Sequence, residues 1–184
     1  FDAAERLVRV QDLGQRIRDA VAESAASAPP GSLIFTNLHA LDLTNDALYS
    51  SSSALAGIAD RVVLEVTERA SLHRIDDLKA RMRRLRELGF RIAVDDLGAG
   101  YSGLSSFAQL EPDVAKLDMS LIRDIDGSSS KASLVKSMIT VCTQDLGIRV
   151  VCEAVETVGE WELPLHGAVN KTLHRAMHAY LTRR

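Results

Sequence analysis

The chain is poor in the residues that mark secreted, membrane-spanning or duplex-binding proteins. Among its 184 residues are only two cysteines, and its net charge is −3. Cys142 and Cys152 lack C-x-x-C spacing and lie in apolar segments, which favours buried free thiols in a cytoplasmic protein over the alternative of a disulfide. No apolar run approaches the roughly 20 residues of a membrane span. The acidic balance argues against a broad basic surface for duplex nucleic acid.

What the chain does contain is a regular alternation of apolar runs and amphipathic segments. Helices are predicted over residues 3–26, 72–88, 105–110 and 133–146, and strands over residues 33–38, 62–67, 91–95, 113–117 and 148–153. Gly89 and Gly147 end two of these helices. The strands are continuous apolar runs, which favours a parallel sheet covered on both faces. This indicates one α/β domain over residues 1–184. A closed (β/α)8 barrel usually takes about 250 residues, so we expect two or three units to be missing from this chain.

Five successive predicted strands end in, or contain, polar residues that a core would not need. They are Asn37, Glu65, Asp95 with Asp96, Lys116 and Glu153. In a parallel barrel the carboxyl ends of all strands meet at one face, so these side chains are expected to converge. A lone carboxylate in such a place is more often a helix cap or an ion-pair partner. A set of five favours a shared site, whose oxygens suit Mg²⁺ or Mn²⁺. Two such ions about 3.5–4 Å apart serve phosphodiester hydrolysis.

Two of these residues, Lys116 and Glu153, have two possible roles each. Lys116 is either a surface lysine of the usual kind or a group that holds a reacting phosphate oxygen. Glu153 is a candidate general base or a further metal ligand. Glu68 is a candidate anchor for the loop over residues 97–103, through hydrogen bonds from backbone N–H groups. Asp118 is expected to cap the following turn. Four arginines of the helix over residues 72–88 are interpreted as its solvated face: Arg81, Arg83, Arg84 and Arg86.

In order along the chain, five segments resemble the successive signatures of EAL domains, a family of cyclic-di-GMP phosphodiesterases. The segments are Thr36-Asn37-Leu38-His39, Glu65-Val66-Thr67-Glu68, the Asp95-Asp96 loop, Lys116-Leu117-Asp118 and Glu153-Ala154-Val155-Glu156-Thr157. The resemblance covers residues 1–157, and residues 158–184 form a divergent segment with an expected basic helix over 168–184. It implies an incomplete (β/α)8 TIM-type barrel that uses two Mg²⁺ or Mn²⁺ ions to hydrolyse cyclic-di-GMP to linear pGpG.

The same resemblance implies a role for each matching residue. Four of them would be metal ligands: Asn37, Glu65, Asp95 and Asp96. The catalytic residues would be Lys116, which orients the attacking water, and Glu153, which acts as base or completes the metal shell. Glu68 would steady the loop after Asp96.

The chain also departs from the family pattern. The Glu-Ala-Leu segment that supplies a further ligand is not found, so it either precedes Phe1 or is absent, and the family's C-terminal Gln-Gly strand is missing. Leu97, Ala99 and Gly103 replace the family's usual phenylalanine, threonine and serine. The alternative function is therefore a degenerate, inactive EAL domain that senses the nucleotide or binds a protein partner. The resemblance further implies a homodimer beside the Asp96 loop and flanking regulatory domains.

Overall fold

A parallel sheet forms the centre of the computed structural model, which describes residues 9–67, 72, 75–99, 103–157 and 160. Its strands follow chain order and are β1 (Ile34–Asn37), β2 (Val62–Thr67), β3 (Arg91–Leu97), β4 (Val114–Leu117) and β5 (Arg149–Cys152). Every neighbouring pair is parallel. Parallel strands in sequential order, each followed by helical segments, are the arrangement of a (β/α)8 TIM-type barrel. The predicted α/β class is confirmed, and within the described residues the barrel is not closed.

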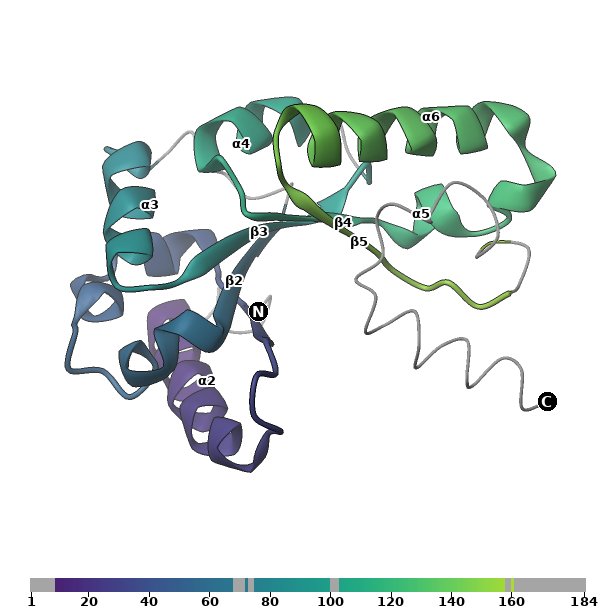
Figure 1. Ribbon diagram of the computed structural model, residues 1–184. Helices are drawn as coiled ribbons and strands as arrows, with labels where there is room; N and C mark the ends of the chain where they lie inside the picture. Colours follow the sequence, from purple (N-terminus) through teal and green to yellow (C-terminus); the bar gives the residue numbers. More distant parts are fainter. Residues whose placement is uncertain (1–8, 68–71, 73–74, 100–102, 158–159, 161–184) are drawn as a thin grey trace.

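The helices lie around the outside of this sheet, as Figure 1 shows for α2, α3, α4 and α6. The α-helices are α2 (Val10–Ser24), α3 (Leu78–Glu87), α4 (Gly103–Leu110), α5 (Met119–Ile122) and α6 (Ser129–Thr140). Short 3₁₀ helices fill the connection from β1 to β2: η2 (Ala40–Thr44), η3 (Asp46–Tyr49) and η4 (Ala56–Arg61). The other short helices are the 3₁₀ helices η1 (Ala25–Ser27) and η6 (Ile125–Gly127) and the π-helix η7 (Val141–Asp145). No helix in the described part of the chain has the length and apolar character needed to span a bilayer.

The two faces of the sheet carry apolar clusters of very different size. The main core lies between the strands and the helices and includes Leu64, Ile92 and Leu117, all fully buried. On the other face, a small cluster is formed by Val63, Ala93 and Val114, with Leu33 and Val151 packed against it. Because side chains alternate across a strand, the next inward position lies two residues further along each strand. These are the positions at which the polar residues of the strand ends stand.

For two helices, α3 and α6, the first residue differs from the one predicted from the sequence. Helix α3 begins at Leu78, because Asp77 adopts the left-handed conformation (φ 53°) just before it. Leu72 and Ile75 are nevertheless buried, and the Ile75 N–H donates to the Leu72 carbonyl at 3.0 Å. Helix α6 begins earlier than predicted, at Ser129, where the Ser128 hydroxyl accepts the N–H of Lys131. The predicted helices over 3–26 and 168–184 lie partly and wholly outside the described residues.

The interpretation of the α3 arginines as a solvated face holds for Arg83 and Arg84, which are exposed, and only in part for Arg81 and Arg86, which are half-buried. Arg81 donates to the Leu43 carbonyl at 2.8 Å, and the Arg84 guanidinium stacks over the Tyr49 ring at 4.5 Å. Arg86 donates to the Leu110 carbonyl at 2.9 Å. Long arginine side chains reach polar partners across apolar surface, which a helical pattern of charges does not reveal.

The two cysteines are free and buried, as predicted. Burial raises the pKa of the Cys152 thiol to about 12 and also raises that of Cys142. Thiols in such surroundings stay protonated and unreactive at neutral pH.

Candidate functional site

Polar residues replace the small apolar cluster at the carboxyl ends of the strands. Glu65 follows Val63 by two positions, Asp95 follows Ala93, Lys116 follows Val114 and Glu153 follows Val151. Strand alternation therefore sends all four side chains to the same face, beyond the apolar cluster. The convergence predicted from the sequence thus has a simple cause, which is the two-residue period of the strands.

The ammonium group of Lys116 lies at the centre of this group of side chains. Its Nζ is 2.6 Å from Glu65 Oε1, 2.8 Å from Asp95 Oδ1 and 2.7 Å from Glu153 Oε1. The lysine side chain is only 13% exposed, whereas that of Glu153 is 34% exposed. Lys116 is therefore an interior lysine that contacts carboxylates from three other strands or strand ends. The reading of Lys116 as an ordinary surface lysine is excluded.

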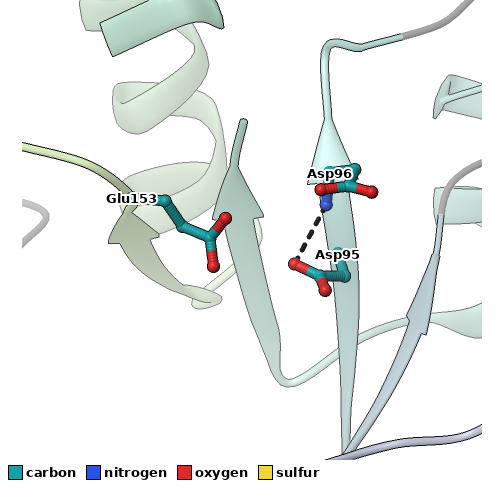
Figure 2. A group of neighbouring side chains, drawn as sticks. All are labelled: Asp95, Asp96 and Glu153. Atoms are coloured by element: carbon teal, nitrogen blue, oxygen red, sulfur yellow. Dashed lines mark hydrogen bonds between the residues drawn. The ribbon is translucent and has the colours of Figure 1, made fainter. Parts of the chain in front are cut away.

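Asp95 and Asp96 are adjacent in sequence, yet both carboxylates reach the site. The register of β3 against β4 shifts between Val94 and Leu97, and Asp96 has a positive φ of 56°. The Asp96 N–H donates to Asp95 Oδ1 at 3.0 Å, as Figure 2 shows. Carboxylate oxygens of Asp95, Asp96 and Glu153 lie within 4.8 Å of one another. A bulge with a left-handed residue is a common way to redirect a side chain at a functional site.

Burial and neighbouring charges shift the pKa values of three residues in the cluster, which are Glu65, Asp96 and Lys116. Burial raises the pKa of Glu65 despite the Lys116 ammonium beside it. Burial, together with the neighbouring Asp95 carboxylate, raises the pKa of Asp96. For Lys116, burial alone would lower the pKa, but hydrogen bonds to Asp95, Glu153 and Glu65 outweigh it and raise the pKa. Lys116 is therefore a permanent cation at every physiological pH.

Asn37 was also predicted to belong to the site. Asn37 is exposed at the end of β1 and is paired in register with Glu65 of β2. In-register residues of parallel strands share a face, so Asn37 borders the cluster next to Glu65. Glu68, predicted to anchor the loop after Asp96, lies outside the described residues. Asp118 caps α5 by accepting the Ser120 N–H at 2.9 Å, as predicted.

One buried acidic residue near the site was missed. Glu160 is 4% exposed, and its carboxylate accepts backbone N–H groups of Asp124, Glu156 and Thr157. A signal for it was present, because Thr157-x-x-Glu160 has the spacing of a capping box, in which the two residues bond to each other's backbone N–H. Glu160 N–H donates to Thr157 Oγ1 at 3.1 Å, which completes that motif.

The donor set fits a hard divalent cation. All its ligand atoms are oxygens, and three carboxylates approach within 4.8 Å of one another, a spacing that a single ion can bridge. The buried Glu65 Oε1 is paired with Lys116 Nζ at 2.6 Å.

Comparison with known proteins finds a matching family and similar curated proteins. A family model described as the EAL domain matches residues 1–166. The cyclic di-GMP phosphodiesterase NbdA of Pseudomonas aeruginosa is 36% identical over 144 residues, which are 78% of this chain and 17% of NbdA. The blue light- and temperature-regulated antirepressor BluF of Escherichia coli is 28% identical over 134 residues, which are 70% of this chain and 33% of BluF.

The solved structures that match are EAL-domain proteins as well. Klebsiella pneumoniae BlrP1, in a complex with calcium and cyclic-di-GMP, superposes with a TM-score of 0.73 at 35% identity. The match covers 83% of this chain and 40% of that one. A manganese and cyclic-di-GMP complex of the same protein also gives a TM-score of 0.73, at 34% identity over 82% of this chain and 40% of that one. This chain therefore spans less than half the length of each of these relatives.

Proposed function

This chain belongs to the EAL domain family, and from that premise we propose that it hydrolyses cyclic-di-GMP to linear pGpG with two Mg²⁺ or Mn²⁺ ions. The observation that carries the proposal is the group of carboxylates gathered around Lys116 at the carboxyl ends of the strands. The solved relatives that bind cyclic-di-GMP with calcium or manganese support the choice of substrate and of divalent ions.

The residues at the site divide naturally into ligands and groups that handle water. Four residues with oxygen donors would hold the ions: Asn37, Glu65, Asp95 and Asp96. Divalent ions so held would activate water and stabilise charge on the leaving oxygen. Lys116 would orient the attacking water or a phosphate oxygen through its N–H donors. Glu153 would take up the proton of the water, and its partly exposed carboxylate is open to solvent for that purpose.

The proposal extends to the parts of the protein around this site. Glu68 is assigned to the loop after Asp96, which it would order by accepting backbone N–H groups. A homodimer beside that loop and flanking regulatory domains are the proposed assembly. The flanking domains are supported by the curated relatives, whose chains are much longer than the region that matches this one.

The direct test is an incubation with cyclic-di-GMP and either ion, followed by chromatography for linear pGpG. Asp95→Asn and Glu153→Gln should each lower kcat at least 100-fold, because each removes a charge that the reaction needs. The matched control is Glu87→Gln, which neutralises an exposed carboxylate on α3. Full turnover in either site variant would contradict the proposal.

The second candidate function is a nucleotide sensor or protein-binding domain without turnover. It is favoured by the 28% identity to BluF, whose name is that of an antirepressor. It is also favoured by Ala99, where the family has a threonine hydroxyl. Binding of cyclic-di-GMP with no product, in the same incubation, would select this function over hydrolysis.

A further inference from the structure

The carboxylate of Glu160 joins two loops that leave the site. Its Oε2 accepts the N–H groups of Glu156 at 2.8 Å and Thr157 at 3.1 Å, both in the loop that follows β5. Its Oε1 accepts the N–H of Asp124 at 3.0 Å, in the connection that follows β4, between α5 and η6. The side chain is 4% exposed. A capping box uses one carboxylate oxygen, so the bond from Oε1 to a residue 36 positions away is additional to it.

These two loops carry the groups that meet at the centre of the site. Lys116 lies in β4, just before one loop, and Glu153 opens the other, with its Oε1 2.7 Å from Lys116 Nζ. A second contact joins the same loops on the surface, where Arg123 Nη2 lies 2.8 Å from Glu156 Oε1. That pair is largely exposed and contributes little. The buried Glu160 is therefore a connection between the loops in addition to the backbone hydrogen bond of Glu153 N–H to the Leu117 carbonyl at 3.3 Å.

The backbone beside Glu153 needs such a connection. Ala154, the next residue, has a φ of 52°, a left-handed conformation that costs a residue with a Cβ atom free energy. Surrounding contacts must hold a turn of this kind. The Glu160 carboxylate holds it from the far side, through the N–H groups of Glu156 and Thr157.

We infer that Glu160 is a positioning residue that holds Glu153 against Lys116, by tying the loop after β5 to the loop after β4 through Oε1. The inference deepens the proposed hydrolysis and rests on it for its effect on turnover. A carboxylate suits the task because both oxygens accept N–H donors. A glutamine has one oxygen, and it would turn that oxygen to the N–H groups of Glu156 and Thr157 and its NH₂ toward Asp124.

Two variants separate the loop connection from simple capping. Glu160→Gln keeps the side-chain shape and removes the bond to Asp124, whereas Thr157→Ala breaks the capping box and leaves Oε1 in place. Both are compared in the intact protein, below their unfolding temperatures. The readouts are kcat and KM for cyclic-di-GMP, and deuterium uptake in peptides that cover residues 118–127.

Glu160→Gln should lower kcat at least tenfold with KM within threefold, and should speed deuterium uptake over residues 118–127 at least fivefold. Thr157→Ala should keep kcat within twofold. Equal losses of kcat in both variants, or unchanged kcat or uptake in Glu160→Gln, would overturn the inference. If the unmodified protein forms no linear pGpG, the proposed function fails instead. The uptake then decides alone: faster exchange in Glu160→Gln supports the loop connection, and unchanged exchange refutes it.

Discussion

At the scale of single residues, Lys116 places one positive charge among three carboxylates. Removing it would leave those carboxylates, of which Glu65 and Asp95 are buried, close together without a counter-charge, which is far costlier than losing an exposed pair. The raised pKa of Lys116 fixes the pH range of its contribution. Stabilisation by a group whose pKa rises on folding is complete below its unfolded value, here 10.5, and declines only above that pH.

Lys116→Met should therefore lower the free energy of unfolding by about 3 kcal/mol in the presence of a chelator. The loss should be the same at pH 7 and pH 9, because both lie below 10.5. Urea denaturation at the two pH values measures it. The matched control is Lys79→Met, whose exposed pair with Glu111 should cost less than about 1 kcal/mol. Equal losses in the two variants would contradict this account of the cluster.

The contribution of Glu160 to stability should depend on pH in the opposite direction, because it should be lost at low pH. Burial alone would raise its pKa, but the backbone N–H groups of Glu156, Asp124 and Thr157 outweigh burial and hold the pKa below 4.5. Its stabilisation is complete above pH 4.5 and is lost as the pH falls through the lower, folded value. The thermal midpoints of the unmodified protein and Glu160→Gln should thus differ most at pH 7 and converge toward pH 3. A constant difference across that range would count against an ionised Glu160.

At the scale of elements, a buried ion pair fixes the connection after β1. Arg18 of α2 lies 3.0 Å from Asp42 of η2, and both side chains are almost fully buried. Gly14 makes room for them, since a Cβ atom there would lie 2.4 Å from Asp42 Oδ1. Helix η2 begins three residues after Asn37, so this contact sets the path of the chain as it leaves the site.

Gly14→Ala should destabilise the fold by about 1–3 kcal/mol, because the new methyl group overlaps the Asp42 carboxylate. Gly57→Ala is the control, since nothing lies within 4 Å of a Cβ atom at that position in η4. Thermal unfolding of both variants measures the difference. If Gly14→Ala were as stable as Gly57→Ala, the α2–η2 contact would not be tightly packed.

The elements also show which features a single sequence reveals. The strands could be predicted because each is a continuous apolar run, and the convergence of Glu65, Asp95, Lys116 and Glu153 follows from strand alternation. The burial of Arg18 could not be predicted from its residue type, although it shares the face of α2 that carries the buried Val10 and Gly14. The contacts of Arg18 and Glu160 join segments more than 20 residues apart, and such polar contacts leave no periodic pattern in the sequence.

At the scale of the whole molecule, ion binding should appear as stability. A ligand that binds only the folded state at 100 times its Kd adds about 2.7 kcal/mol to the free energy of unfolding. Saturating Mn²⁺ should therefore raise the thermal midpoint, and a chelator should reverse the shift. Asp95→Asn should abolish the shift and Glu87→Gln should retain it, as measured by scanning calorimetry. A shift of equal size in Asp95→Asn would place the binding of Mn²⁺ elsewhere.

The position of Lys116 has a further consequence for how the strands align as the chain folds. A parallel strand that slips by two residues keeps its apolar side chains on the correct face, so hydrophobicity alone tolerates that error. Such a slip in β4 would move Lys116 about 6.6 Å along the sheet. Glu65, Asp95 and Glu153 would then lack their shared cation. The charges that prepare this site for chemistry thus also specify one pairing of β4 with its neighbours and penalise the misaligned alternatives.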